Sequence, residues 1–273
     1  MIHKATGYWI NEAAPQPEFP PLEGDHAFDV AVVGGGFTGL WTAYHLKRAE
    51  PDLKVGLIES HRIGHGPSGR NGGFVDAMWV SFASLVARYG ERPALELARA
   101  SERSVAQVGE FLEERGVDAW FRKSGYLNVS TAPVYDHSWD QNLNAMRAAG
   151  ILDGPREMTA AEVQEICASP AFRSGVHYGA AATVQPARLA FGIRDAAGDL
   201  GVDLFEASPA TRIEDSGPTV RISTPNGRAS AGRVILANGP TLAGMGSPLR
   251  SNVTLASSHM VITEPVPDVI EEL

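Results

Sequence analysis

Cysteine, basic charge and long apolar runs are all scarce in this sequence. Cys167 is the only cysteine among 273 residues, which excludes an internal disulfide and a cysteine-based metal cluster and leaves a buried, inert thiol as the expectation. Lys and Arg number 23 against 32 Asp and Glu, and the net charge of -9 offers no general basic surface for nucleic acid. No apolar run approaches the roughly 18–20 residues that span a bilayer, and the first residues do not resemble a signal peptide. We therefore expect a cytoplasmic protein with no metal site, no nucleic-acid partner and no membrane span.

The remaining composition is that of an ordinary globular protein. Hydrophobic residues make up 44% of the chain and charged residues 20%, and the length suits one large domain or two small ones. Residues 1–27 contain Pro15, Pro17, Pro20 and Pro21 with little apolar periodicity. This segment is predicted to be a Pro-rich, extended N-terminal arm on the surface.

A strand, a glycine turn, a helix and a second strand follow the arm. Asp29–Val33 is an apolar, Val-rich run, as a strand buried on both faces of a parallel sheet requires. Leu40–Ala49 has helical apolar spacing and ends before Pro51, and Lys54–Ile58 is the second strand. The pattern predicts a right-handed βαβ unit.

Further elements are predicted along the rest of the chain. Helices are expected at Arg92–Arg115, at Ala187–Leu200, and from a capping box of Thr159 and Glu162 through Ile166. Strands are expected at Trp120–Ser130, Val202–Phe205, Thr219–Ser223 and Arg233–Ala237, with a turn at Pro225–Gly227.

The glycine turn has the pattern of a dinucleotide-binding site. Gly34 permits a tight turn, Gly36 lets the backbone approach a pyrophosphate, and Gly39 lets the helix pack close to the strand. Glu59 ends the second strand about 20 residues later, where a carboxylate accepts hydrogen bonds from an adenosine ribose and repels a 2′-phosphate. The residues predicted to bind cofactor here are Gly34, Gly35, Gly36, Phe37, Thr38, Gly39, Glu59 and Ser60. These features do not separate NAD from FAD, which share the adenosine diphosphate half.

A second motif follows and carries a family resemblance. IGHGPSGRNGG, residues Ile63–Gly73, resembles the second flavin-contacting motif of the D-amino-acid oxidase-like (DAO) family of FAD-dependent oxidoreductases. The Pro-rich arm, DVAVVGGGFTGL, SPATRIE and RVILANG extend the resemblance over nearly the whole chain.

The resemblance implies FAD as the cofactor and further binding residues. The second motif would line the pyrophosphate and isoalloxazine through Ser68, Gly69, Arg70, Asn71, Gly72 and Gly73. The backbone near Ala210 and Thr211 would meet the adenine, and Ala237, Asn238 and Gly239 would pass near the cofactor. Some flavoenzymes of this broad family attach flavin through a histidine, but an ordinary loop histidine is the favoured interpretation of His65.

The resemblance also implies the reaction. Family members oxidise the carbon–nitrogen bond of an amine or amino acid to an imine, and oxygen or another acceptor reoxidises the flavin. The small-molecule amine or amino acid is thus the expected partner. No acid–base pair or nucleophilic triad is visible and catalytic residues stay unassigned. Arg122, Tyr126 and His259 are candidate substrate-side groups for which structural roles are favoured.

The fold class follows from both arguments. We expect an α/β protein with a Rossmann-like FAD/NAD(P)-binding domain and an inserted, incomplete β-rich substrate domain. Residues 28–273 would form a DAO-like domain, C-terminally truncated, with FAD-binding segments at about 28–80 and 180–240 and substrate-domain segments at about 120–180 and 241–273. Family members continue beyond the point matching Leu273, so a fragment, or a chain that needs a complementing C-terminal chain, is expected. The alternatives are an NAD-dependent dehydrogenase and a truncated, inactive dinucleotide-binding module.

Overall fold

The computed structural model describes residues 7–151, 153–215, 217–239, 251–252, 254, 256, 258 and 261–271. The chain divides into two compact units. Unit 1 contains Met1–Gly72, Arg115–Ala119 and Gln185–His259, and unit 2 contains Gly73–Glu114, Trp120–Val184 and Met260–Leu273. Which of these segments serve FAD and which serve substrate stays a prediction.

Unit 1 is built on a six-stranded sheet with the order β8-β2-β1-β11-β10-β9. Its strands are β1 (Gly24–Val33), β2 (Val55–Ile58), β8 (Asp203–Phe205), β9 (Arg212–Asp215), β10 (Val220–Ser223) and β11 (Gly227–Leu236). The strands β8, β2, β1 and β11 run parallel, while β9, β10 and β11 form antiparallel neighbours. The predicted parallel sheet and the predicted hairpin are confirmed.

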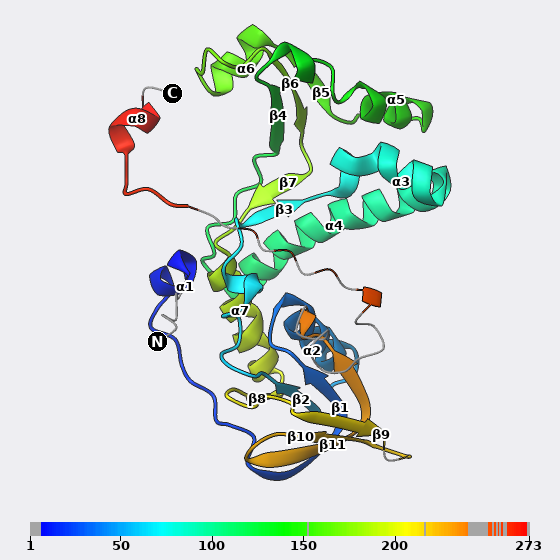
Figure 1. Cartoon of the computed structure of the whole chain (residues 1–273), viewed down its shortest axis with the longest axis vertical. Helices are drawn as coiled ribbons and strands as arrows, with labels where there is room; N and C mark the ends of the chain where they lie inside the picture. The colour runs from blue at the N-terminus through cyan, green and yellow to red at the C-terminus, as the bar shows by residue number, and fades with distance from the viewer. Residues whose placement is uncertain are drawn as a thin grey trace. The chain divides into compact units, whose positions relative to one another are not determined.

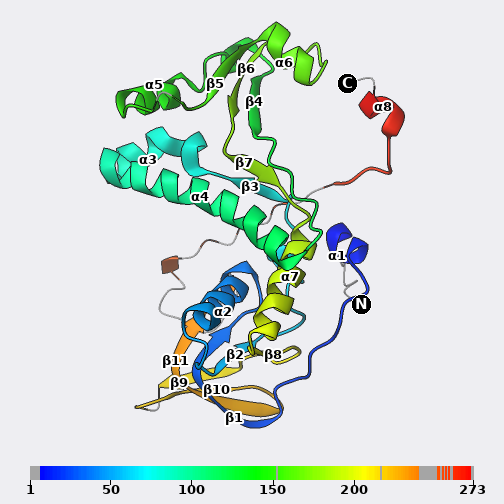
Figure 2. The same ribbon diagram turned by 180° about the vertical axis from the view of Figure 1, so that it is seen from behind.

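The central strand is buried on both faces, as its sequence indicates. Val30, Ala31, Val32 and Val33 are each at most 7% exposed. Ala31 and Val33 pack into an apolar cluster on one face, while Val32 faces α2 (Phe37–Ala49) on the other. Figures 1 and 2 draw α2 beside α7 (Pro186–Asp199), and the two helices contact each other. The predicted βαβ unit is confirmed, with α2 beginning three residues before the predicted start.

The N-terminal arm differs from the prediction. Tyr8–Glu12 form the short helix α1, and the first residues of β1 fall inside the predicted arm of residues 1–27. Ile10 is 5% exposed and Leu22 is fully buried. A wholly extended surface arm is therefore wrong, because apolar residues on either side of the prolines pack into unit 1.

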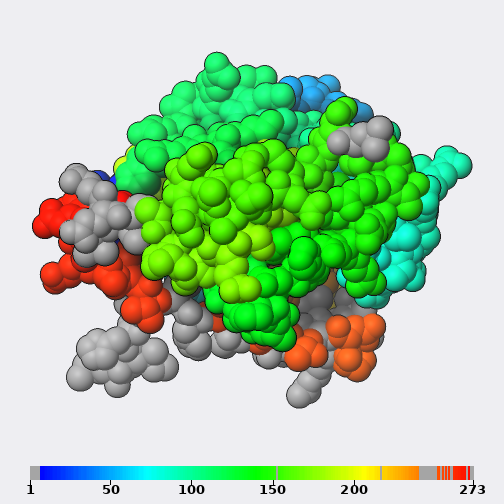
Figure 3. All heavy atoms as spheres, turned by 90° about the horizontal axis from the view of Figure 1, so that it is seen from above, coloured from blue at the N-terminus to red at the C-terminus, as the bar shows by residue number. Residues whose placement is uncertain are grey.

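Unit 2 combines two small sheets with helices. The two-stranded sheet pairs β3 (Phe74–Asp76) with β7 (Ala181–Thr183), and the three-stranded sheet has the order β4 (Tyr126–Ser130), β6 (Ser174–Tyr178), β5 (Arg156–Thr159). The helices are α3 (Phe82–Tyr89), α4 (Glu91–Arg115), α5 (Asp140–Ala148), α6 (Ala160–Ile166) and α8 (Pro267–Glu271), with 3-10 turns η2 (Met78–Ser81) and η3 (Pro133–Tyr135). In Figure 3 the residues coloured green form a continuous surface of this unit. No helix within the described ranges is long and apolar enough to cross a membrane.

The predicted capping box at the start of α6 is confirmed and gives a stability prediction. The Thr159 hydroxyl accepts the Glu162 N–H, and the Glu162 carboxylate accepts the Thr159 N–H at 2.8 Å. We expect Thr159→Ala to destabilise unit 2 by about 1 kcal/mol, because the helix loses its N-cap acceptor. Urea unfolding measures the change, and Thr159→Ser, which keeps the hydroxyl, is the control. Equal midpoints for the two variants would contradict the prediction.

Candidate nucleotide-binding site

The glycine turn joins β1 to α2 where space is too small for side chains. Gly34 has φ of 113°, and a Cβ on it would lie 2.6 Å from the Ala237 carbonyl oxygen. A Cβ on Gly39 would lie 1.9 Å from the Gly34 carbonyl oxygen, so α2 packs directly against the turn. Both glycines are therefore required by backbone geometry.

The N-terminus of α2 lies next to the loop of the second motif. Gly36 is the N-cap of α2, and the Phe37 N–H donates to the Ser68 hydroxyl at 2.9 Å. A Cβ on Gly36 would lie 2.9 Å from that same hydroxyl oxygen. Helix geometry leaves the N–H groups of the first turn, including those of Thr38 and Gly39, without an intrahelical carbonyl. Together with the helix dipole, worth about 0.3–1 kcal/mol, they favour an anion at this point.

Glu59 follows β2 and lies against the glycine turn. One carboxylate oxygen accepts the Gly35 N–H at 2.7 Å. The other accepts the Ser60 hydroxyl and the His61 N–H, each at 2.9 Å. A carboxylate offers about four acceptor sites, so the carboxylate keeps acceptor capacity for a further hydroxyl.

The second motif forms an irregular loop around η1 (Pro67–Gly69). The Gly64 N–H donates to the Gly35 carbonyl at 2.9 Å, which ties this loop to the glycine turn. A Cβ on Gly69 would lie 2.3 Å from the Gly64 carbonyl oxygen, and the Asn71 amide donates to the Ser68 carbonyl at 2.7 Å. The loop therefore holds its shape through glycine contacts and local amide bonds.

The rest of the second motif leads out of this loop. The Arg70 side chain donates to the Gly66 carbonyl at 3.3 Å, and Gly72 is the last residue of this stretch in unit 1. Gly73 has φ of 76°, begins the segment that belongs to unit 2, and accepts the Val184 N–H.

The other predicted cofactor residues divide into two groups. Ala237, Asn238 and Gly239 follow β11, and the Ala237 N–H donates to Val33 at 2.8 Å, beside the glycine turn. Thr211 lies at the start of β9, where its N–H and hydroxyl both donate to the Ser223 carbonyl. The structure thus gathers the glycine turn, Glu59, the second motif and the end of β11, whereas Thr211 is hydrogen-bonded to the neighbouring strand β10.

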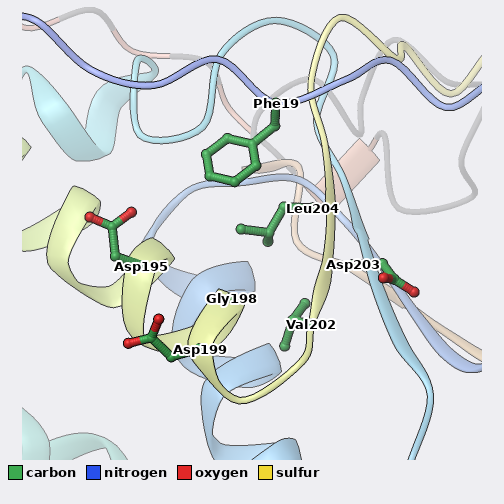
Figure 4. A pocket seen from close by; sticks show the side chains of 7 residues that line it. All are labelled: Phe19, Asp195, Gly198, Asp199, Val202, Asp203 and Leu204. Atoms are coloured by element: carbon green, nitrogen blue, oxygen red, sulfur yellow. The ribbon is translucent and has the colours of Figure 1, made fainter.

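A hollow of about 440 Å³ lies elsewhere in unit 1. Figure 4 shows its lining, with Phe19 and Leu204 at its apolar side and Asp195 and Asp199 on α7. Asp195 pairs with Arg194 and Asp199 pairs with Arg115, so their charges are compensated. The second motif packs earlier on α7, against Ala190 and Phe191, and this hollow is therefore separate from the glycine turn.

Two of the three candidate substrate-side groups have structural contacts. Arg122 exchanges backbone hydrogen bonds with Thr183, and Tyr126 pairs with Tyr178 between β4 and β6. His259 lies outside the described residues. The favoured structural interpretation fits the first two.

The family assignment follows from comparison with known proteins. The model of the FAD-dependent oxidoreductase (DAO) family matches residues 29–272. The chain belongs to the DAO family of FAD-dependent oxidoreductases. It is 31% identical over 238 residues to the probable oxidoreductase OrdL of Rhizobium meliloti (strain 1021), covering 85% of this chain and 54% of that protein. It is 28% identical to gamma-glutamylputrescine oxidoreductase of Escherichia coli (strain K12), covering 96% of this chain and 61% of that protein.

A solved structure agrees with this DAO-family assignment at the level of fold. The crystal structure of glycine oxidase from Geobacillus kaustophilus matches with a TM-score of 0.68 at 23% identity, covering 84% of this chain and 60% of that one. The chain therefore spans between one half and two thirds of the length of these relatives.

The residues present fit the cofactor of the DAO family. Its adenosine diphosphate half needs a cradle without side chains at a helix start and an acceptor for the ribose. Gly34 and Gly39 let the turn and α2 pack closely, Gly36 presents no side chain at the helix start, and the Glu59 carboxylate could act as the ribose acceptor. The sequence analysis did not predict a role for Gly64, which has a positive φ and donates to the Gly35 carbonyl, so that it couples the two motifs. Its place in the glycine-rich stretch Gly64–Gly66 is the feature that indicates such a role.

His65 gives a pH-dependent prediction for this loop. Its half-buried ring lies 5.8 Å from the Phe191 ring, and burial, followed by the positive charges of Arg62, Arg194 and Arg70, lowers the pKa of His65. The pKa of His65 in the folded state lies below the unfolded value of about 6.5, so protonation of His65 favours the unfolded state. The contribution of neutral His65 to the stability of the fold is therefore present above that pH and is lost on acidification. We expect His65→Gln to lose less stability than the wild type on acidification below about pH 6.5. Urea midpoints measured across this range test it, and parallel pH profiles would contradict it.

Proposed function

We propose that this protein is an FAD-dependent oxidoreductase that oxidises the carbon–nitrogen bond of an amine or amino acid to an imine. The observation that carries the proposal is the junction of the glycine turn, Glu59 and Ser68 at the carboxyl ends of β1 and β2. Ligands of open α/β sheets bind at such strand ends. Membership of the DAO family supports FAD over NAD at this junction.

Each part of the junction has a role toward FAD. The N–H groups of Gly36, Thr38 and Gly39 would bind the pyrophosphate, and Glu59 with Ser60 would receive the adenosine ribose. The second motif, with Ser68, Gly69, Arg70, Asn71, Gly72 and Gly73, extends the site toward the flavin. Ala237, Asn238 and Gly239 close the turn from the neighbouring strand, and Thr211 contributes from β9 toward the adenine.

The protein positions the reactants rather than reacting itself. FAD, when bound, supplies the acceptor for the hydride that leaves the carbon next to the amine nitrogen. The residues of unit 1 would bind and orient it through backbone N–H groups and the Glu59 carboxylate, and we assign no catalytic residue. Oxygen or another acceptor completes the turnover. Gamma-glutamylputrescine oxidoreductase and glycine oxidase support amines or amino acids as the substrate class.

The visible spectrum of the protein supplied with FAD tests the cofactor. We expect a flavin spectrum that acid precipitation releases into the supernatant, because the His65 ring packs against Phe191 and an ordinary loop histidine is the favoured interpretation of His65. Colour retained in the pellet would instead support attachment at His65. A folded protein that binds NAD but not FAD would contradict the proposal in favour of a dehydrogenase, and one that binds neither would favour an inactive module.

Substrate oxidation is a separate measurement from cofactor binding. Oxidation of the substrate is shown when an amine or amino acid bleaches the bound flavin in the absence of oxygen. The imine product is detected as the carbonyl compound that its hydrolysis gives. Since the chain covers 54–61% of the OrdL and gamma-glutamylputrescine oxidoreductase sequences, it is assayed alone and with the complementary segment of a relative. Bound FAD that no amine or amino acid reduces in either assay would contradict the proposed reaction.

Gly36 provides the sharpest substitution. We expect Gly36→Ala to raise the FAD dissociation constant at least tenfold, or by ~1.4 kcal/mol, because the added methyl enters the pyrophosphate approach and meets Ser68. Quenching of flavin fluorescence measures the constant. The matched control is Gly179→Ala, where an added Cβ meets nothing within 4 Å. Equal affinities for the two variants would contradict the placement of the pyrophosphate.

A further inference from the structure

The N-terminal arm is clamped to the start of α7 by an ionic network. Arg188 donates to both carboxylate oxygens of Glu12, at 2.6 and 3.1 Å. Gln185, the N-cap of α7, donates to Glu12 at 2.7 Å and to the Trp9 carbonyl at 2.8 Å. The hydrogen bonds from Arg188 lower the pKa of Glu12, which keeps the carboxylate ionised. Such charge-assisted, bidentate bonds fix geometry as well as contributing energy.

A second clamp lies one to two turns further along α7. The side chain of Arg194 is 1% exposed and donates to the Gln16 amide oxygen at 2.8 Å. Its guanidinium lies 5.4 Å from the Phe19 ring and 4.9 Å from the Phe191 ring. A buried arginine between two aromatic rings is held in one orientation. The arm is therefore docked by specific contacts over residues 9–19.

The docked arm packs against the second motif. Ile10 and Ala13 form an apolar cluster with Ala187 and Phe191 of α7. Ile10 also lies against Gly69, because a Cβ on that glycine would meet the Ile10 side chain at 3.3 Å. Gly7 lies against the Arg70 side chain, where its own Cβ would be 2.7 Å from Cγ. Helix α1 thus packs against η1 at Gly69, close to Gly64.

The contact continues to the glycine turn. Gly69 is the neighbour of Ser68, and Ser68 accepts the Phe37 N–H at the start of α2. Helix α7 contacts η1 both directly and through α1, and η1 contacts the N-terminus of α2. Since η1 is a single 3-10 turn in an irregular loop, its position depends on what packs against it.

We propose that residues 7–13 of the arm are a positioning segment of the cofactor site, which sets FAD affinity by holding η1 against the start of α2. This inference rests on the proposed function. The arm contacts Gly69 and Arg70 of the second motif and acts through them and through the adjoining Ser68.

The test is FAD affinity in variants that loosen the arm. We expect Ile10→Ala and Glu12→Gln each to raise the FAD dissociation constant roughly five- to tenfold, measured by flavin fluorescence quenching. Glu18→Gln is the matched control in the arm: Glu18 lies outside residues 7–13, its exposed carboxylate pairs with Arg62, and Arg62 keeps its contact with Glu206. Val163→Ala controls for loss of stability, because Val163 is fully buried in α6 of unit 2. Both controls are expected to bind FAD as the wild type does.

Coupling of this kind is reciprocal and gives a second readout. If the arm strengthens FAD binding, FAD must slow hydrogen exchange of the amides over residues 10–14 by the corresponding factor. We expect this protection in the wild type and a smaller one in Ile10→Ala. A merely structural arm would show neither.

The outcomes separate the two proposals. Wild-type affinity in both arm variants, or equal exchange of residues 10–14 with and without FAD, overturns the role of the arm while leaving the proposed function in place. The role of the arm is also overturned if Val163→Ala weakens FAD binding as much as Ile10→Ala does. A folded wild-type protein that binds no FAD contradicts the proposed function and this inference together.

Discussion

The close approach of helix α2 to strand β1 is the constraint on which the candidate site depends. The helix axis is so near the strand that a single methyl on Gly39 would overlap the Gly34 carbonyl, and a methyl on Gly34 would overlap Ala237. The geometry turns the first N–H groups of α2 toward the carboxyl ends of the parallel strands. The anion-binding site that we propose would then arise from backbone groups, in a chain whose net charge is negative.

Three further layers hold this turn in place. Glu59 braces it from β2 through Gly35, and the second motif braces it through Gly64 and Ser68. Behind the second motif lies α1, fixed to α7 by Glu12 and Arg188. Residues far apart in sequence thus act on one helix start, and rigid support of this kind is what a cofactor site requires.

Much of this architecture could be predicted from sequence because its signals are local. The Val-rich run before the glycines, the helical spacing after them and the acid at the end of β2 are all contained in a single βαβ unit. The capping box at Thr159 is equally local, since both partners lie within one helical turn. The family resemblance then separated FAD from NAD, which the spacing of the glycines does not do.

The parts that sequence did not predict depend on long-range contacts. The bond from Phe37 to Ser68 joins residues 31 positions apart, and the bonds from Arg188 to Glu12 join residues 176 positions apart. The prolines of the arm indicate an extended chain, but the burial of Ile10 is decided by Ala187 and Phe191 on α7. Strands β3 and β7 are three residues long, too short for an alternating pattern to stand out.

Thermal unfolding with different ligands tests the central claim most directly, which is that the glycine turn and its supports bind the adenosine diphosphate half of FAD. A ligand that binds only the folded state at 100 times its dissociation constant stabilises by about 2.7 kcal/mol. The account predicts that FAD raises the melting temperature, that ADP raises it less, and that FMN, which lacks the adenosine half, leaves it unchanged. Stabilisation by FMN equal to that by FAD, with none by ADP, would contradict it.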